Sequence, residues 1–138
     1  MTPTTTTSPA RDDRGFVAPF TVAVASALIW LLAIVLDGGR WMRAQSNTFG
    51  TAAAAARAGA QEIDVAAVLR GELALDEAAA QAAAYDYLAA RGLNGTVTVE
   101  GLEVTVTAHS TVDFQLLPIG QATVEETATA RATQEQGP

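Results

Sequence analysis

The stretch Phe16–Leu36, FVAPFTVAVASALIWLLAIVL, decides the fold of this chain. It carries no charged residue, and residues 37–40 (DGGR) follow it at once. An α-helix rises roughly 1.5 Å per residue, so a helix of this length covers the hydrocarbon core of a bilayer, which is about 30 Å thick. Trp41 can lie at the lipid–water interface, and Arg40 and Arg43 can reach the headgroups. The sequence therefore predicts a transmembrane helix over residues 16–36.

A cleaved secretory signal is the alternative to a retained span. Such signals have a shorter apolar region, roughly 7–15 residues, followed by a small-residue cleavage site. Here the triplet Ala25-Ser26-Ala27 lies inside the run, and the apolar residues Leu28–Leu36 still follow it. The length of the run favours a retained membrane anchor.

The orientation of the span does not follow from charge alone. Arg11 and Arg14 precede it and Arg40 and Arg43 follow it, so the positive-inside count is balanced. Residues 1–15 are rich in Thr and contain Pro, which is typical of a disordered tail. Because everything able to fold comes after the span, we expect a single-pass protein of the cell membrane. Its N-terminus would be cytoplasmic and its C-terminal domain extracytoplasmic.

The helix is expected to continue outside the membrane over residues 37–70, because no strong helix breaker comes before Gly71. Apolar and small residues recur along this segment at three- and four-residue steps and form one stripe, which we term the packing seam. The packing seam consists of Phe49, Ala52, Ala53, Ala56, Ala60 and Ile63. Two roles fit it: the stripe covers the chain's own sheet, or its small residues let several copies pack helix on helix.

Residues 71–133 are expected to form a small α+β extracytoplasmic domain. Asp76 is a good helix N-cap and Gly92 a good C-terminal stop, so a short second helix is expected between them. Beyond Gly92 the period of the apolar residues changes to two, which indicates strands. Residues 134–138 are expected to be a frayed tail.

The strands are expected to form a small antiparallel sheet of three to four members. The segment TVTVEGLEVTVTA reads as a hairpin that turns at Glu100-Gly101, pairs Val97 with Val104 and directs every Val to one face. Further strands are expected over residues 110–117 and 123–132. Together with the long first helix, this predicts an α+β fold in a pilin-like layout.

Composition excludes several classes of function. The 138-residue chain has a formal net charge of -7, and its basic residues are all Arg and scattered, whereas a nucleic-acid-binding protein needs a clustered basic face. There is no Cys for a disulfide or a thiolate. His109 is the single histidine and is expected at a strand end, so a Ser/His/Asp triad or a histidine-based metal site cannot be built without help from another chain. We expect no enzyme, no cofactor, no metal site and no nucleic-acid partner.

Four segments in series carry a resemblance to a known family. DRGF, the apolar span, DGGRWMRAQ and AAAAARAGAQEID together resemble the TadE/TadG-like pilus assembly proteins of tight-adherence (Flp-type) systems, in particular the short actinobacterial kind. The resemblance implies a non-catalytic, pseudopilin-like subunit or assembly factor without a cofactor. Its partners would be membrane lipid, other pilus or secretion subunits and the inner-membrane platform, with self-association through the packing seam.

The resemblance also implies a candidate processing site. Prepilin-type cleavage would follow Gly15 and leave Phe16 as the new N-terminus. The glutamate that pilins carry five residues into the mature chain is replaced by Phe20 in this sequence.

A function of another class is consistent with the same residues. In this alternative the chain is a single-span envelope binding module, whose outer α+β domain captures a wall component or a ligand while the span only tethers it.

Overall fold

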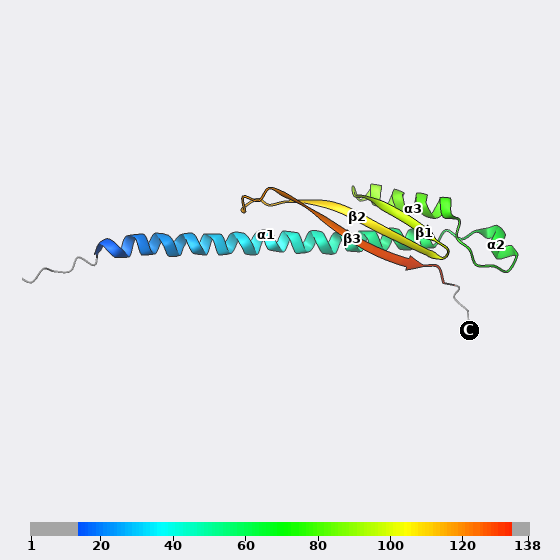
Figure 1. Cartoon of the computed structure of the whole chain (residues 1–138), viewed down its shortest axis with the longest axis horizontal. Coiled ribbons are helices and arrows are strands. Elements are labelled where there is room, and N and C mark those ends of the chain that lie inside the picture. The colour runs from blue at the N-terminus through cyan, green and yellow to red at the C-terminus, as the bar shows by residue number, and fades with distance from the viewer. Residues whose placement is uncertain (1–13, 134–138) are drawn as a thin grey trace, which may run out of the picture.

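The structure, a computed structural model, describes residues 14–133, with side chains from Val17 onward. Most of the expected N-terminal tail and the whole expected C-terminal tail, residues 1–13 and 134–138, lie outside this range. The elements are α1 (Arg14–Ala60), α2 (Val65–Leu69), α3 (Glu77–Ala90), β1 (Asn94–Glu100), β2 (Glu103–Asp113) and β3 (Gln121–Arg131). This is the predicted α+β fold, with a long apolar N-terminal helix, short helices and a three-stranded antiparallel sheet (Figure 1).

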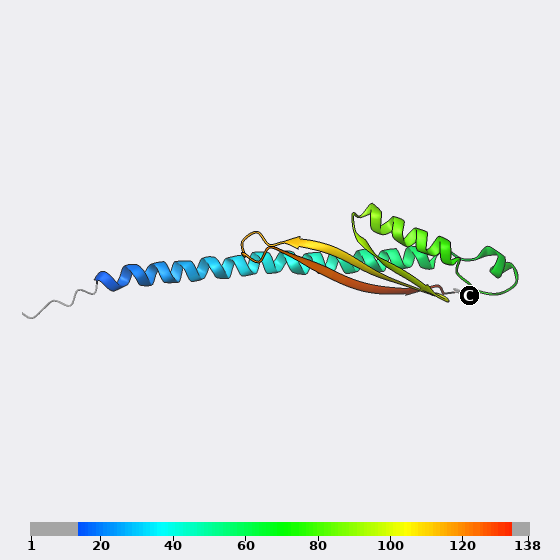
Figure 2. The ribbon, with the colours of Figure 1, turned by 45° about the horizontal axis from the view of Figure 1, so that its top comes forward.

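α1 is one helix of 47 residues that runs through Gly38 and Gly39 without a break. Its C-terminal part lies against the sheet and α3, whereas its N-terminal part projects away from them (Figures 1 and 2). The predicted transmembrane helix and the predicted extension are therefore one rigid element.

The expected continuation of this helix to residue 70 is wrong, because α1 ends at Ala60 and α2 is a separate helix. Asp64 is the reason: its carboxylate accepts hydrogen bonds from the backbone N–H groups of Ala66 (2.8 Å) and Ala67 (3.2 Å) and so caps a new helix. Asp is among the best N-cap residues, and a cap in extended conformation interrupts the preceding helix. An isolated bridge between Ile63 and Leu75 then closes the connection.

The second predicted helix is confirmed as α3. Asp76 accepts a hydrogen bond from the Ala79 N–H at 3.0 Å, as expected of an N-cap. Gly92 has a φ of 68°, and the N–H of Leu93 donates to the Leu88 carbonyl at 3.0 Å, which closes the C-terminal end.

The sheet has the order β1-β2-β3, and both pairs are antiparallel. The expected turn at Glu100-Gly101 is wrong by one residue: Glu100 pairs with Glu103, so Gly101 and Leu102 make the turn. Gly101 has a φ of 61°, and a glycine at the first central position is typical of a type II′ turn. The pairing shifts by two residues, and a shift of two keeps every side chain on its face. The Val side chains still point inward.

β2 is longer than the sequence predicts. Residues 110–113 do not begin a new strand but continue β2, because Ser110 pairs with Val124 and Asp113 with Gln121 without interruption. The expected separate strand over residues 110–117 is therefore wrong, and its last residues form the loop to β3.

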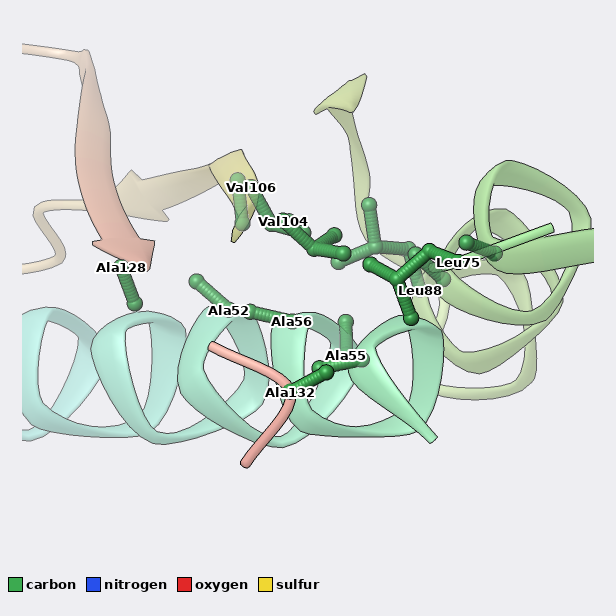
Figure 3. Packing of buried hydrophobic residues seen from close by; sticks show 13 residues of the cluster. Ala52, Ala55, Ala56, Leu75, Leu88, Val104, Val106, Ala128 and Ala132 are labelled. Carbon is green, nitrogen blue, oxygen red and sulfur yellow. The ribbon is translucent and has the colours of Figure 1, made fainter. Parts of the chain in front are cut away.

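One core joins the C-terminal half of α1 to the segment 71–133. Val104 and Val106 on β2, together with Leu88 on α3, cover the alanines of α1 (Figure 3). The buried members of this core are Ala52, Ala55, Ala56, Ala60, Leu75, Ala80, Ala84, Leu88, Val104, Val106, Ala108, Ala128 and Ala132. Each alanine buries little area, so the core depends on close approach of the backbones.

Gly59 allows the closest approach of α3 and the sheet to α1. A Cβ at this position would lie 2.8 Å from the Ala80 carbonyl oxygen and 3.1 Å from Val104 Cγ1. Gly50 also lies in α1, but a Cβ added there would have no atom within 4 Å. The two glycines thus provide a matched pair.

We predict opposite effects for Gly59→Ala and Gly50→Ala on the thermal stability of the detergent-solubilised full chain. Gly50→Ala should stabilise by about 0.5–1 kcal/mol, because it removes only the entropic cost of glycine in a helix. Gly59→Ala should destabilise by about 1 kcal/mol or more, because overpacking of a filled core typically costs about 1–3 kcal/mol. Thermal unfolding of both variants is measured by circular dichroism. An equal gain in stability for Gly59→Ala and Gly50→Ala would contradict the packing described for Gly59.

Candidate functional site

The large apolar side chains in the N-terminal half of α1 are exposed. Within residues 14–133, one helix is long and apolar enough to cross a membrane, and almost none of its most apolar part is buried. The core helix of a water-soluble protein passes the same test of length and composition but is mostly buried, which this helix is not. The exposed large residues of the span are Val17, Phe20, Val22, Val24, Leu28, Ile29, Trp30, Leu31, Leu32, Ile34, Val35 and Leu36. The bare apolar surface indicates membrane anchoring.

Asp37 lies at the C-terminal end of this apolar surface and holds the loop between β2 and β3. Its carboxylate accepts hydrogen bonds from the backbone N–H groups of Leu116 and Leu117, each at 2.9 Å, and of Gln115 at 3.4 Å. Arg40, one helical turn further along α1, donates to the same carboxylate at 3.0 Å. The Asp37 side chain is fully buried by these contacts. We call this arrangement the Asp37 clamp.

The charge of Asp37 is stabilised in the clamp. Burial disfavours the carboxylate, but the hydrogen bonds from Leu117, Leu116 and Gln115 and the charge of Arg40 favour it more strongly. As a result the pKa of Asp37 is lowered from its ordinary value of 3.8. Asp37 is ionised in the folded chain at neutral pH.

Two further contacts fix the same hairpin along α1. Trp41 stacks on Phe114, with ring centroids 6.2 Å apart. About two helical turns further along α1, the Thr48 and Ser110 hydroxyls form a hydrogen bond of 2.7 Å. Trp41 and Arg40, which the sequence assigns to the lipid interface, are therefore also contacts of the folded domain.

The packing seam divides into two parts. Ala52, Ala56 and Ala60 are buried in the chain's own core, and Ala53 is partly buried against it. Phe49 and Ile63 at its ends remain 50% and 40% exposed. Ala55 is also buried in the core, although it lies outside the predicted stripe.

The remaining sequence-predicted positions lie apart from the clamp. Gly15 and Phe16, the candidate processing site, lie in the first turn of α1. His109 lies within β2, where its Nδ1 is 3.4 Å from Glu125 Oε2. Among residues 14–133, no group of three or more His, Asp or Glu side chains is arranged to hold a metal ion.

The Asp37 clamp does not follow from the sequence. Local residues mark Asp37 only as the end of the apolar run, because its partners are 78 to 80 residues away. A single acid at the border of an apolar span, with Arg40 as its nearest cation, was the available signal. Nothing local identifies the amide groups that it binds.

We predict that Asp37→Asn releases the loop of residues 114–120. The amide of Asn keeps one oxygen acceptor but loses the charge and turns a donor toward other donors. Chymotrypsin cleavage in this loop, followed by mass spectrometry on the detergent-solubilised protein, should become several-fold faster. Asp86→Asn, at an exposed site on α3, is the control and should leave the cleavage rate unchanged.

The same readout has a defined pH dependence. Because the pKa of Asp37 is lower in the folded chain than in the unfolded chain, its stabilisation is complete above pH 3.8 and is lost as the pH falls through the lower folded value. An acid-stable protease such as pepsin should therefore find the loop protected just above pH 3.8. Release of the loop on acidification from neutral pH to that point would contradict a lowered pKa.

Residues 15–62 match a family model described as "Putative Flp pilus-assembly TadE/G-like". No curated protein and no solved structure matches the chain. The matched range covers nearly the whole of α1. It contains the apolar span, Asp37 and the packing seam up to Ala60. The resemblance inferred from the sequence is confirmed over this range, and the match supports a role in pilus assembly.

Proposed function

We propose that this protein is a membrane-anchored, pseudopilin-like subunit or assembly factor of a tight-adherence pilus system and that it performs no catalysis. One observation carries the proposal: α1 is a single helix with a bare apolar half and a half that supports a small sheet. Such a helix can pass from a bilayer into a bundle of helices without refolding, since both settings need only close packing along its side.

The proposed topology is a single pass. Residues 16–36 span the membrane, the short N-terminal segment lies in the cytoplasm, and the sheet with α2 and α3 lies outside. The exposed apolar surface of residues 16–36 supports the membrane span. The position of β1, β2 and β3 after the span supports an outer location of the sheet. The core shared by α1 and residues 71–133 means that the outer domain includes the C-terminal half of α1.

We propose that partner subunits contact the span and Phe49 rather than the alanines of the packing seam. The alanines are covered by the chain's own sheet, whereas Phe49 is half exposed on the part of α1 just outside the membrane. Partners of this surface would be other pilus subunits or the inner-membrane platform. A second copy of the chain would use the same surface.

A role beside the filament fits this sequence better than a place deep inside it. Phe20 stands where pilins carry the glutamate that pairs with a neighbouring amino group, so cleavage after Gly15 would not recreate that ion pair. An assembly factor held in the membrane does not require it.

Site-specific photo-crosslinking in pilus-forming cells tests the proposal. A photoreactive residue at Phe49 should give light-dependent adducts with other pilus components in the membrane fraction. The same residue at Leu69, an exposed apolar position on α2, is the control and should give none. Adducts that contain only wall material, at any position, would favour the envelope binding module instead.

A substitution at the same position separates contact from folding. Phe49 is half exposed and lies outside the core, so Phe49→Ser should lower the free energy of unfolding by about 1–2 kcal/mol at most and leave the chain folded. The number of surface appendages should nevertheless fall. Normal appendages and unchanged crosslinking would count against the proposal.

A further inference from the structure

We propose that the loop between β2 and β3, residues 114–120 (FQLLPIG), inserts into the lipid leaflet at the C-terminal end of the span. The partner of this surface is lipid, and the chain would contact the bilayer at two places, through α1 and through the hairpin tip. The inference rests on the proposed membrane span of residues 16–36.

The loop reaches below the border of the span. Leu116 lines a small apolar pocket of about 190 Å³ together with Ile29, Trp30, Leu32 and Ala33 of α1. Ala33 is only 6% exposed, unlike the residues around it in the span. Ile29 lies seven residues before Leu36, which corresponds to about 10 Å along a helix. A bilayer that covers the span up to Leu36 therefore also meets Leu116.

The side chains of the loop suit lipid. The loop carries no charge, and its large apolar residues Leu116 and Ile119 are 48% and 65% exposed. Both views show the hairpin tip lying beside the middle of α1, away from the rest of the sheet (Figures 1 and 2). Exposed large apolar residues next to a membrane span are typical of segments that enter the interface.

The backbone N–H groups of the loop are satisfied within the protein. Irregular backbone is normally excluded from lipid, because each unpaired polar group there costs several kcal/mol. In this loop every backbone N–H from Phe114 to Ile119 has an acceptor. Gln115, Leu116 and Leu117 donate to Asp37, Phe114 donates to the Gly120 carbonyl at 3.0 Å, Ile119 donates to the Leu117 carbonyl at 2.8 Å, and Pro118 has no N–H. The Asp37 clamp thus satisfies three of the backbone donors of this irregular segment at the lipid border.

Depth-dependent fluorescence quenching on the full chain tests this inference. The chain has no Cys, so single cysteines can be introduced and labelled with an environment-sensitive dye after reconstitution into phosphatidylcholine–phosphatidylglycerol vesicles. Ile119→Cys reports on the loop. Val24→Cys, exposed within the span, reports on the membrane anchor, and Thr98→Cys, exposed on β1, reports on the aqueous domain.

We expect nitroxide-bearing lipids to quench the dye at position 119 as they do at position 24, and aqueous iodide to quench only the dye at position 98. Adding Asp37→Asn to Ile119→Cys should restore quenching by iodide.

Iodide quenching at position 119 with lipid quenching at position 24 would overturn the inference and leave the membrane anchor intact. Protection of position 119 from both quenchers would also overturn it, because the loop would then be covered by protein. Iodide quenching at position 24 would overturn the membrane anchor itself, and the inference with it.

Discussion

The contact between Asp37 and the backbone of the β2–β3 loop joins two segments that lie far apart in the sequence. The acceptor lies at the end of the apolar span, and its donors lie up to 80 residues later in the sequence. A buried carboxylate is unfavourable unless its oxygens are satisfied, and here three amides and one guanidinium satisfy them. The hairpin can therefore lie flat along α1 with its tip at the border of the span. The Trp41–Phe114 stack, the Thr48–Ser110 hydrogen bond and the core between α1 and the sheet add to this contact.

Small residues determine how the domain packs beyond the clamp. The C-terminal half of α1 presents Ala52, Ala56 and Gly59 to elements that approach within van der Waals contact. The larger side chains of the core, such as Leu88 and Val104, come from α3 and the sheet. This division places the small residues of α1 inside the protomer. In the proposed assembly role, contacts with other subunits would fall to the exposed apolar half of α1 and to Phe49.

Local signals in the sequence predicted a large part of this fold. The long apolar N-terminal helix, the caps of α3 at Asp76 and Gly92, and the inward face of the Val residues follow from local sequence, and the structure agrees with them. The errors arose where two local choices compete or where a distant partner decides. Asp64 ended α1 by capping a new helix, Gly101 moved the hairpin turn by one residue, and pairing with β3 kept β2 continuous through Ser110. The Asp37 clamp could not be predicted, because its donors are backbone amides that no side chain identifies.

The clamp also restricts how the sheet can move relative to α1. A single membrane helix with a flexible connection lets its outer domain tilt and rotate freely. In this chain α1 passes from the span into the core without a break, and the hairpin returns along it to the level of Asp37. The sheet is thus fixed to the helix at both ends, by the alanine core and by the clamp. In the proposed membrane arrangement, the height and rotation of the sheet relative to the bilayer are set before any partner binds. Association with other subunits then needs less ordering of the outer domain, and that reduces the entropic cost of assembly.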